Sequence, residues 1–275
     1  MKDIIRTIKI NELYPFKDTP FRPHDLGEIT ESIKENGILS PLIARPGGDG
    51  GYEVISGYRR MLGAEKAGIK DVPVIVREMD DDTAIITLVD SNLHRENILA
   101  SERAFAYKMK LEAIKHQGLT CVQLGHKSRD VIAEGAGVSS SQVQRYIRLT
   151  ELIKPLLDLV DSGRIAISPA VELSYLLKER QHEVVLVFEA EDKTPSYSQA
   201  VRMRKMSSEG ILDKYMITKI MSEDKPNQRE VLKLKSEKIQ GFFPPSYTSK
   251  QMEDVILKLL EGWHRQQNRE RERSR

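Results

Sequence analysis

The sequence has almost no cysteine, few aromatic residues and no motif of metal-ligand spacing. Its 275 residues include one cysteine, Cys121, and one tryptophan, and aromatic residues make up 6% of the chain. A single cysteine excludes an internal disulfide. The six histidines are scattered without the regular spacing of a metal site. The sequence also lacks a P-loop, a nucleophile elbow and a dinucleotide fingerprint, so the common enzyme signatures are missing.

Long apolar runs are also missing. No apolar stretch approaches the roughly 18 residues that a membrane-spanning helix needs. The first residues, Met1–Arg6, do not form an apolar secretion segment. We therefore expect a cytoplasmic protein that makes no membrane contact.

Neither sign of charge dominates. The chain has 43 lysines and arginines against 41 aspartates and glutamates, which gives a net charge of +2. Contact with nucleic acid must therefore come from local patches and base readout, because the chain lacks a general positive field. Hydrophobic residues make up 39% and charged residues 31%. The length allows one large domain or two to three small ones.

The first part of the chain predicts mixed helix and strand, and the rest predicts helices. Apolar alternation favours strands over residues 4–10, 41–45, 52–56 and 72–76. Asp25 and Glu28 predict a capping box at the start of a helix. The fold class is α+β, with a small mixed N-terminal domain (1–97) and an all-α domain (98–205). An irregular linker (206–248) and an amphipathic helix with a basic tail (249–275) follow.

Three further cap signals predict helix starts in the second half of the chain. We expect Ser101 to cap a longer helix that ends at Gly118. Ser168, followed by Pro169 at the first helical position, predicts another start. Ser196 and Gln199 have the spacing of a capping box.

A glycine and two arginines stand where a strand leads directly into a helix. Gly57 follows a β-branched run, and Arg59 and Arg60 fall in the first helical turn. Two cations there oppose the helix macrodipole, which favours negative charge at that end. The free N–H groups of a helix start can bind a phosphate, and a glycine there lets the backbone come close to it. The two arginines add bidentate hydrogen-bond donors to the same phosphate. The alternative is two solvated arginines on a surface helix.

Residues 128–149 predict a helix-turn-helix. A short helix (128–134), a glycine turn (135–138) and a second helix (142–149) follow one another, with Ser139 and Gln142 as a capping box. Val143 would face the core. The polar side chains of this segment can reach base edges and phosphates. The candidate DNA contacts are Ser128, Ser139, Ser140, Ser141, Gln142, Gln144, Arg145 and Arg148. The alternative is a generic helix pair in a bundle.

The chain ends in a second strongly amphipathic segment. Residues 251–263 place six apolar side chains on one helix face. Such a stripe must bury against something, either a second copy of the chain or its own domain. Residues 264–275 are mostly polar and charged and predict a disordered tail.

Three sequence blocks, in this order, resemble the ParB/RepB family of partition proteins. The first covers residues 11–15 and 19–23 and continues over 29–46. The second is Ile-Ser-Gly-Tyr-Arg-Arg-Met-Leu-Gly-Ala at 55–64, and the third is Ser-Asn-Leu-His-Arg-Glu-Asn at 91–97. The helix-turn-helix follows at the distance usual in that family. The resemblance extends over about residues 5–205.

This resemblance implies a division of labour between the domains. The N-terminal domain would bind CTP with Mg²⁺, and the second domain would read a palindromic, centromere-like DNA site as a homodimer. A ParA-type ATPase would be the partner, and the protein would associate with a nucleoid or plasmid. Asn92 would lie on the metal side of the nucleotide. The implied nucleotide-binding residues are Gly57, Tyr58, Arg59, Arg60, Arg95 and Arg22.

The chain departs from the family pattern at two positions. Tyr58 and Ser91 stand where the family has glutamates. Mg²⁺ prefers carboxylates, and hydrolysis needs a positioned water as well as charge neutralisation. The hypothesis is a protein that binds a nucleoside triphosphate and hydrolyses it slowly or not at all. Alternatives are a transcription or nucleoid-occlusion regulator, a small-molecule kinase, or a nuclease using Asp80, Asp81 and Asp82, which are more simply a helix cap.

Overall fold

The computed structural model describes residues 4–23, 25–48, 50–93, 95, 98–117, 125–223, 241–244 and 246–273. The chain divides into two compact units, Met1–Glu223 and Asp224–Arg275. Cys121 and the third-block residues His94, Glu96 and Asn97 lie outside the described residues. Within the described part of the chain, no helix has the length and apolar character needed to cross a membrane.

A five-stranded mixed sheet forms the start of the first unit. Its strands lie in the order β1-β5-β3-β4-β2. The pairs β1/β5 and β3/β4 are antiparallel, and β3/β5 and β2/β4 are parallel. The strands are β1 (Ile5–Lys9), β2 (Leu13–Pro15), β3 (Leu42–Pro46), β4 (Tyr52–Ser56) and β5 (Asp71–Val76). The four predicted strands are confirmed, and β2 is an additional one.

Three helices, α1 (Gly27–Asn36), α2 (Tyr58–Lys66) and α3 (Asp81–Leu93), accompany the sheet. Helices α1 and α2 pack together, and α3 packs against β4. The predicted capping box of α1 is wrong, because the helix begins after Leu26 without a side-chain cap. Asp25 instead accepts a hydrogen bond from the Gly27 N–H at 3.0 Å. That short-range bond forms a turn ahead of the helix.

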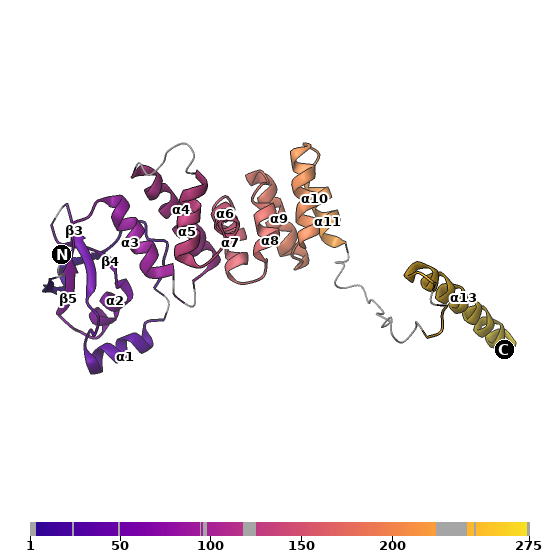
Figure 1. Ribbon diagram of the computed structural model, residues 1–275, viewed down its shortest axis with the longest axis horizontal. Helices are drawn as coiled ribbons and strands as arrows, with labels where there is room; N and C mark the ends of the chain where they lie inside the picture. The colour runs from indigo at the N-terminus through magenta and orange to yellow at the C-terminus, as the bar shows by residue number, and fades with distance from the viewer. Residues whose placement is uncertain are drawn as a thin grey trace. The chain divides into compact units, whose positions relative to one another are not determined.

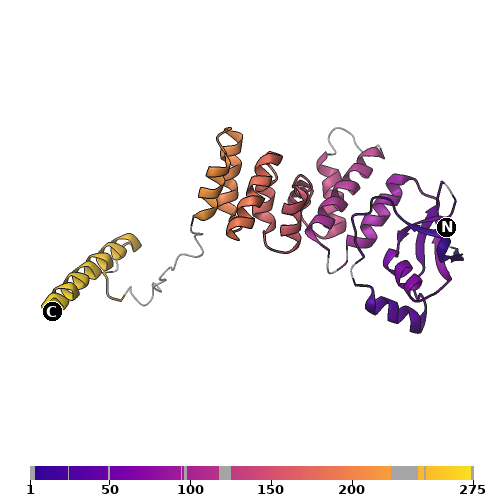
Figure 2. The same ribbon diagram turned by 180° about the vertical axis from the view of Figure 1, so that it is seen from behind.

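The rest of the first unit is helical. Figures 1 and 2 show its helices following one another side by side, in chain order. One hydrophobic core runs from Phe16 and Ile55 through Tyr107 and Leu149 to Ile220. The core therefore crosses residues 97 and 205, and the domain boundaries proposed there stay predictions. The helices are α4 (Ala100–His116), α5 (Gly125–Ala136), α6 (Ser140–Leu149), α7 (Lys154–Asp161), α8 (Ile167–Leu173), α9 (Lys178–Glu191), α10 (Tyr197–Ser208) and α11 (Lys214–Ser222).

Two of the three predicted caps in this region are wrong, and one is confirmed. Ser101 lies inside α4, which begins after Leu99. Ser168 lies inside α8, where Pro169 is the third helical residue. Ser196 does cap α10: its hydroxyl accepts from the Gln199 N–H at 3.3 Å, and Gln199 Oε1 accepts from the Ser196 N–H at 2.8 Å.

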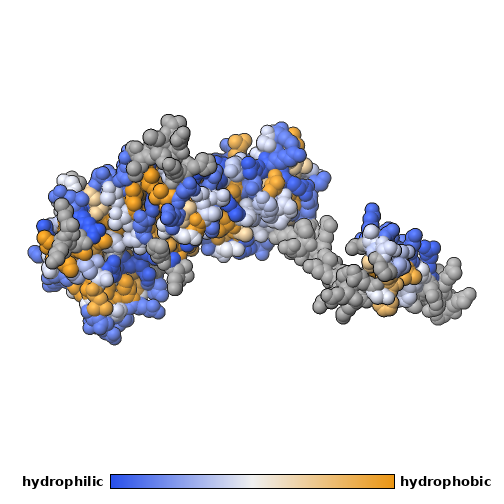
Figure 3. Space-filling model, viewed as in Figure 1, coloured by the Kyte–Doolittle hydropathy of each residue, from blue (hydrophilic) through white to orange (hydrophobic). Residues whose placement is uncertain are grey.

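The second unit contains helix α13 (Ser249–Arg273). The prediction of a disordered tail is wrong for residues 264–273, because the helix continues through them. Leu259 and Trp263 are 68% and 60% exposed. Figure 3 shows orange, hydrophobic surface on this helix. The predicted irregular segment lies partly outside the described residues (224–240), and its first part contains the end of α10 and α11.

Candidate functional site

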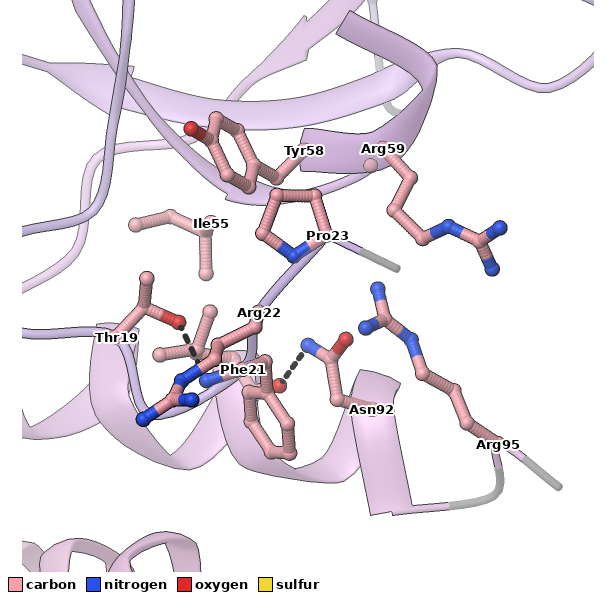
Figure 4. A pocket seen from close by; sticks show the side chains of 11 residues that line it. Thr19, Phe21, Arg22, Pro23, Ile55, Tyr58, Arg59, Asn92 and Arg95 are labelled. Atoms are coloured by element: carbon pink, nitrogen blue, oxygen red, sulfur yellow. Dashed lines mark hydrogen bonds between the residues drawn. The ribbon is translucent and has the colours of Figure 1, made fainter. Parts of the chain in front are cut away.

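A pocket lies between the loop after β2, the start of α2 and the end of α3 (Figure 4). Six of the seven residues predicted to hold nucleotide or metal line it: Arg22, Gly57, Tyr58, Arg59, Asn92 and Arg95. Sequence reasoning missed the remaining lining residues, which are Thr19, Phe21, Pro23, Ile55 and Leu88.

Gly57 makes the turn that brings these residues together. Its φ of +99° lies in the left-handed region, where glycine avoids the cost of a side chain. A Cβ at this position would lie 3.1 Å from Leu42 Cγ and 3.0 Å from Arg60 Nη2. Strand β4 is buried up to Ile55, and α2 begins at Tyr58, directly after the Gly57 turn. The first turn of α2 therefore opens at the pocket.

Arg22, Arg59 and Arg95 give the pocket its positive charge, and the last two lie close together. Figure 4 shows the two side chains approaching one another from opposite sides, Arg59 from α2 and Arg95 from beyond the end of α3. Arg59 Nη2 donates to the Asp25 carbonyl at 2.6 Å. Among the described side chains, Arg59 Nε is the buried polar atom without a hydrogen-bond partner. A buried donor without a partner is costly, so an acceptor placed there would lower the free energy.

Burial lowers the pKa of Arg95, and the neighbouring charge of Arg59 lowers it further. The negative charge of Glu102 opposes both effects. The Arg95 guanidinium also lies 5.8 Å from the centre of the Phe21 ring. Two facing cations repel each other, so an anion between them would be stabilised by both.

Arg60 lies outside the lining of the pocket. Its Nη1 donates to the carbonyls of Ser40 and Pro41, the latter at 3.0 Å. Burial lowers its pKa. Arg60 therefore ties α2 to the start of β3, and its predicted contact with phosphate stays a prediction without support from its position.

Asn92 is buried near the end of α3, with 6% of its surface exposed. Its Nδ2 donates to the Leu88 carbonyl at 2.7 Å, which leaves its oxygen on the side of the two arginines (Figure 4). None of the described lining residues carries a carboxylate. The described part of the chain also has no cluster of three metal-ligating acids, histidines or cysteines. The donor set therefore fits an anion better than a bare metal ion.

Two buried carboxylates hold the loop that forms one wall of the pocket. Glu53 Oε1 accepts from the Lys17 N–H at 3.2 Å, and Glu102 Oε1 accepts from the Arg22 N–H at 2.9 Å. Glu53 also pairs with Arg45 at 2.7 Å. No sequence pattern indicates these contacts, because they join positions 36 and 80 residues apart.

The acidic run at residues 80–82 is a helix start, as its simpler interpretation predicted. Asp80 Oδ1 accepts from the Thr83 N–H at 2.8 Å, and hydrogen bonds from Thr83 lower the pKa of Asp80. Asp81 pairs with Arg45 at 2.7 Å. These contacts give Asp80 and Asp81 partners within the protein and do not assemble a metal centre.

The predicted helix-turn-helix is present as α5 and α6, joined by a turn with Gly137 at φ +65°. The Ser139 hydroxyl caps α6 by accepting from the Gln142 N–H at 3.2 Å. The helix begins at Ser140, two residues before the predicted start. Val143 is fully buried, as predicted. The opposite side of α6 is exposed.

Four candidate DNA contacts on α6 are exposed, and Ser140, Gln144 and Arg145 have hydrogen-bond partners within the protein. Ser141, Gln142, Gln144 and Arg145 are exposed on α6. Arg145 Nη2 donates to Ser168 Oγ at 2.6 Å. Ser140 donates to Asp130, and Gln144 accepts from Arg129 at 2.6 Å.

Two candidates on the helix pair are constrained more strongly. Arg148 donates to Ser174 Oγ and to its carbonyl at 3.1 and 2.9 Å, and its guanidinium lies 4.0 Å from the Tyr175 ring centre. Ser128 is only 3% exposed. The predicted DNA contact of Ser128 stays a prediction, without support from this low exposure.

Comparison with known proteins finds similarity to ParB proteins. The model of the ParB N-terminal domain family matches residues 1–93. The "Probable chromosome 1-partitioning protein ParB" of Deinococcus radiodurans is 33% identical over 169 residues. That match covers 60% of this chain and 54% of the relative, so the chain spans about half the length of this relative.

Two solved structures of Caulobacter crescentus ParB, both C-terminally truncated, also match. One is complexed to the centromeric parS site, with 24% identity and a TM-score of 0.44 over 78% of this chain and 98% of that chain. The other is complexed with CTP-γ-S, with 29% identity and a TM-score of 0.32 over 63% of this chain and 93% of that chain. The sequence matches show that residues 1–93 match the ParB N-terminal domain family and that the chain is similar to ParB partition proteins.

Proposed function

We propose that this protein is a DNA-binding partition protein whose N-terminal pocket binds a nucleoside triphosphate. The observation that carries the proposal is the unpartnered, buried Nε of Arg59 opposite the guanidinium of Arg95. A triphosphate supplies acceptor oxygens and negative charge to both groups. The family resemblance selects CTP among the triphosphates, and the Caulobacter relative is complexed with a CTP analogue.

Mg²⁺ would reach the pocket on the triphosphate. Mg²⁺ usually keeps several waters and binds through a few carboxylates plus substrate phosphates. Asn92 offers an oxygen, but the described lining residues offer no carboxylate. When bound, the ion would neutralise phosphate charge, while Arg59 and Arg95 hold the remaining charge from the protein side.

Binding would proceed with slow or no hydrolysis. Tyr58 lines the pocket and Ser91 donates to the Leu88 carbonyl at 3.0 Å, so neither supplies an acid for positioning water or metal. We expect no steady phosphate release from CTP, with or without duplex DNA. A phosphate assay that showed DNA-stimulated release from the wild type, lost in Arg59→Ala, would refute this part of the proposal.

The DNA-reading element would be α6, with the exposed side chains Ser141, Gln142, Gln144 and Arg145. A helix-turn-helix dimer reads two half-sites, so its target is palindromic. The exposed apolar residues of α13 would join two copies of the chain. A ParA-type ATPase would be the partner at a nucleoid or plasmid, while a regulator on the same scaffold would differ in its DNA site and partner.

A calorimetric titration of CTP with Mg²⁺ tests the pocket. Arg59→Ala removes the buried donor, so we expect CTP affinity to fall at least about tenfold, since charge-assisted hydrogen bonds contribute roughly 1.5–3 kcal/mol. Arg6→Ala, an exposed arginine on β1, is the matched control and should bind as the wild type does. Equal affinity of Arg59→Ala and Arg6→Ala would contradict the assignment.

A further inference from the structure

A buried carboxylate at the start of α4 lies next to the pocket without lining it. Glu102 is 4% exposed. Its Oε2 accepts from the Leu99 N–H at 3.3 Å and so caps the helix. A buried carboxylate is tolerated only when it has several hydrogen-bond partners. The Leu99 N–H at the helix start is one partner of Glu102, and the carboxylate has others.

The second oxygen of Glu102 reaches the pocket loop. Oε1 accepts from the Arg22 N–H at 2.9 Å, across 80 positions of sequence. Arg22 and its neighbours Thr19, Phe21 and Pro23 form one wall of the pocket. Any shift of this wall on ligand binding would therefore change the hydrogen bond between the Arg22 N–H and the Glu102 carboxylate.

Glu102 also interacts electrostatically with Arg95, on the opposite wall of the pocket. Arg95 stands in the segment that joins α3 to α4, and this segment ends at Leu99, which donates to Glu102. The negative charge of Glu102 raises the pKa of Arg95 against the effects of burial and Arg59. A polyphosphate between the arginines would compete with Glu102 for the charge of Arg95.

Helix α4 connects the residues that contact the pocket with α6, the helix proposed to read DNA. It packs directly on α6, where Tyr107 and Tyr146 meet edge to face with ring centres 5.9 Å apart. The Arg103 guanidinium lies 5.4 Å from the Tyr146 ring centre. Beside Glu102, the Ser101 N–H and hydroxyl both donate to Asp161 of α7, the former at 2.9 Å. The first turn of α4 is thus bonded to the pocket and to the helical domain.

We infer that Glu102 is a positioning residue that couples occupation of the pocket by a nucleoside triphosphate to the placement of α4 and α6. This inference rests on the proposed function. Binding draws Arg95 toward the phosphates, which changes the balance of partners at Glu102. The Arg22 N–H and the first turn of α4 then adjust together. A ligand can shift an equilibrium only by such differential contacts.

Hydrogen–deuterium exchange of the full chain, with and without CTP and Mg²⁺, tests the inference. In the wild type, CTP should slow exchange at residues 19–23 and change it in α6. Glu102→Gln keeps the shape and one acceptor but loses the charge. In this variant the effect at 19–23 should remain, while the effect in α6 should fall about fivefold or more, within the usual range of coupling.

The exposed Glu112 on the same helix provides the control, and Glu112→Gln should behave as the wild type does. Ser101→Ala leaves Glu102 intact and removes the hydroxyl bond to Asp161, so it should weaken the α6 effect even if Glu102→Gln folds poorly. An unchanged α6 response in both variants, or no α6 response in a wild type that binds CTP, would overturn the inference. A wild type that binds no CTP in calorimetry would instead refute the proposed function.

Discussion

At the residue scale, the backbone conformation of Gly57 and the placement of Arg59 depend on each other. Gly57 adopts φ +99°, and the chain enters α2 one residue later. A side chain at Gly57 would press on Leu42 and on the Arg60 guanidinium. The direction in which Arg59 leaves the helix therefore depends on a position where only hydrogen fits without strain.

Gly57→Ala should destabilise the protein and weaken nucleotide binding. The left-handed conformation costs a non-glycine residue roughly 1–2 kcal/mol. We expect the Tm to fall by about 2–8 °C in thermal unfolding, the range for such a loss in a unit of this size. Gly48→Ala is the control, because Gly48 has no positive φ and a Cβ added there would meet no atom within 4 Å. A Gly57→Ala protein as stable as Gly48→Ala would contradict the strain argument.

At the residue scale, the sequence predicts the local turn at Gly57 but not the contacts that join distant segments. Gly57 and Arg59 follow from a strand–glycine–helix pattern within a few consecutive residues. The role of Glu102 could not be predicted, because its partner Arg22 is 80 residues away. Arg60 was assigned to phosphate by adjacency, yet its side chain reaches the carbonyls of Ser40 and Pro41.

At the element scale, α6 depends on one polar cap. Ser139 Oγ accepts from the Gln142 N–H, satisfying one of the free donors at the helix start. Tertiary packing holds the helix through Val143, Tyr146 and Leu149, which are all buried. The cap therefore fixes where the exposed polar residues begin, and the apolar face fixes which way they point.

Ser139→Ala should cost about 1 kcal/mol of stability, the usual value for loss of an N-cap. Urea unfolding monitored by circular dichroism measures it. Ser141→Ala, an exposed serine two residues further along the same helix, should leave the unfolding midpoint unchanged. If both variants unfolded at the wild-type midpoint, the cap would not contribute as described.

Secondary structure was predictable for strands with strong apolar alternation, and less so at helix starts. The strand β4 (Tyr52–Ser56) has the predicted bounds. The short strand β2 was missed because its pairing with β4 is parallel and non-local, and its sequence ends in Pro15. Ser101 was expected to cap α4, but its hydroxyl is bonded to Asp161. Tertiary contacts outweighed local cap preference there.

At the scale of the whole molecule, a protein that reads a palindromic site needs two copies of α6. Helix α13 offers exposed apolar side chains within its own unit, including Leu259, Leu260 and Trp263. Pairing of such a face with a second copy would remove apolar surface from water. Pairing through α13 of the second unit would then give the two-fold symmetry that two copies of α6 need in order to bind a palindromic site.

Deletion of residues 249–275 should convert a dimer to a monomer and weaken binding to duplex DNA by loss of avidity. Sedimentation velocity of the full chain and the deletion measures the first effect directly. Lys258→Ala, an exposed polar position on the same helix, should stay dimeric. A deletion variant that stayed dimeric would place the self-association elsewhere in the chain.

The most direct test of the central claim is calorimetric titration of the wild-type chain with CTP, ATP, GTP and UTP, each with Mg²⁺. The pocket of Arg59 and Arg95 predicts binding of a triphosphate, and the resemblance to ParB proteins predicts selectivity for CTP. Selective binding of CTP would support a nucleotide-gated partition protein despite Tyr58 and Ser91. Absence of binding by all four nucleotides would contradict that account and leave a DNA-binding protein without nucleotide control.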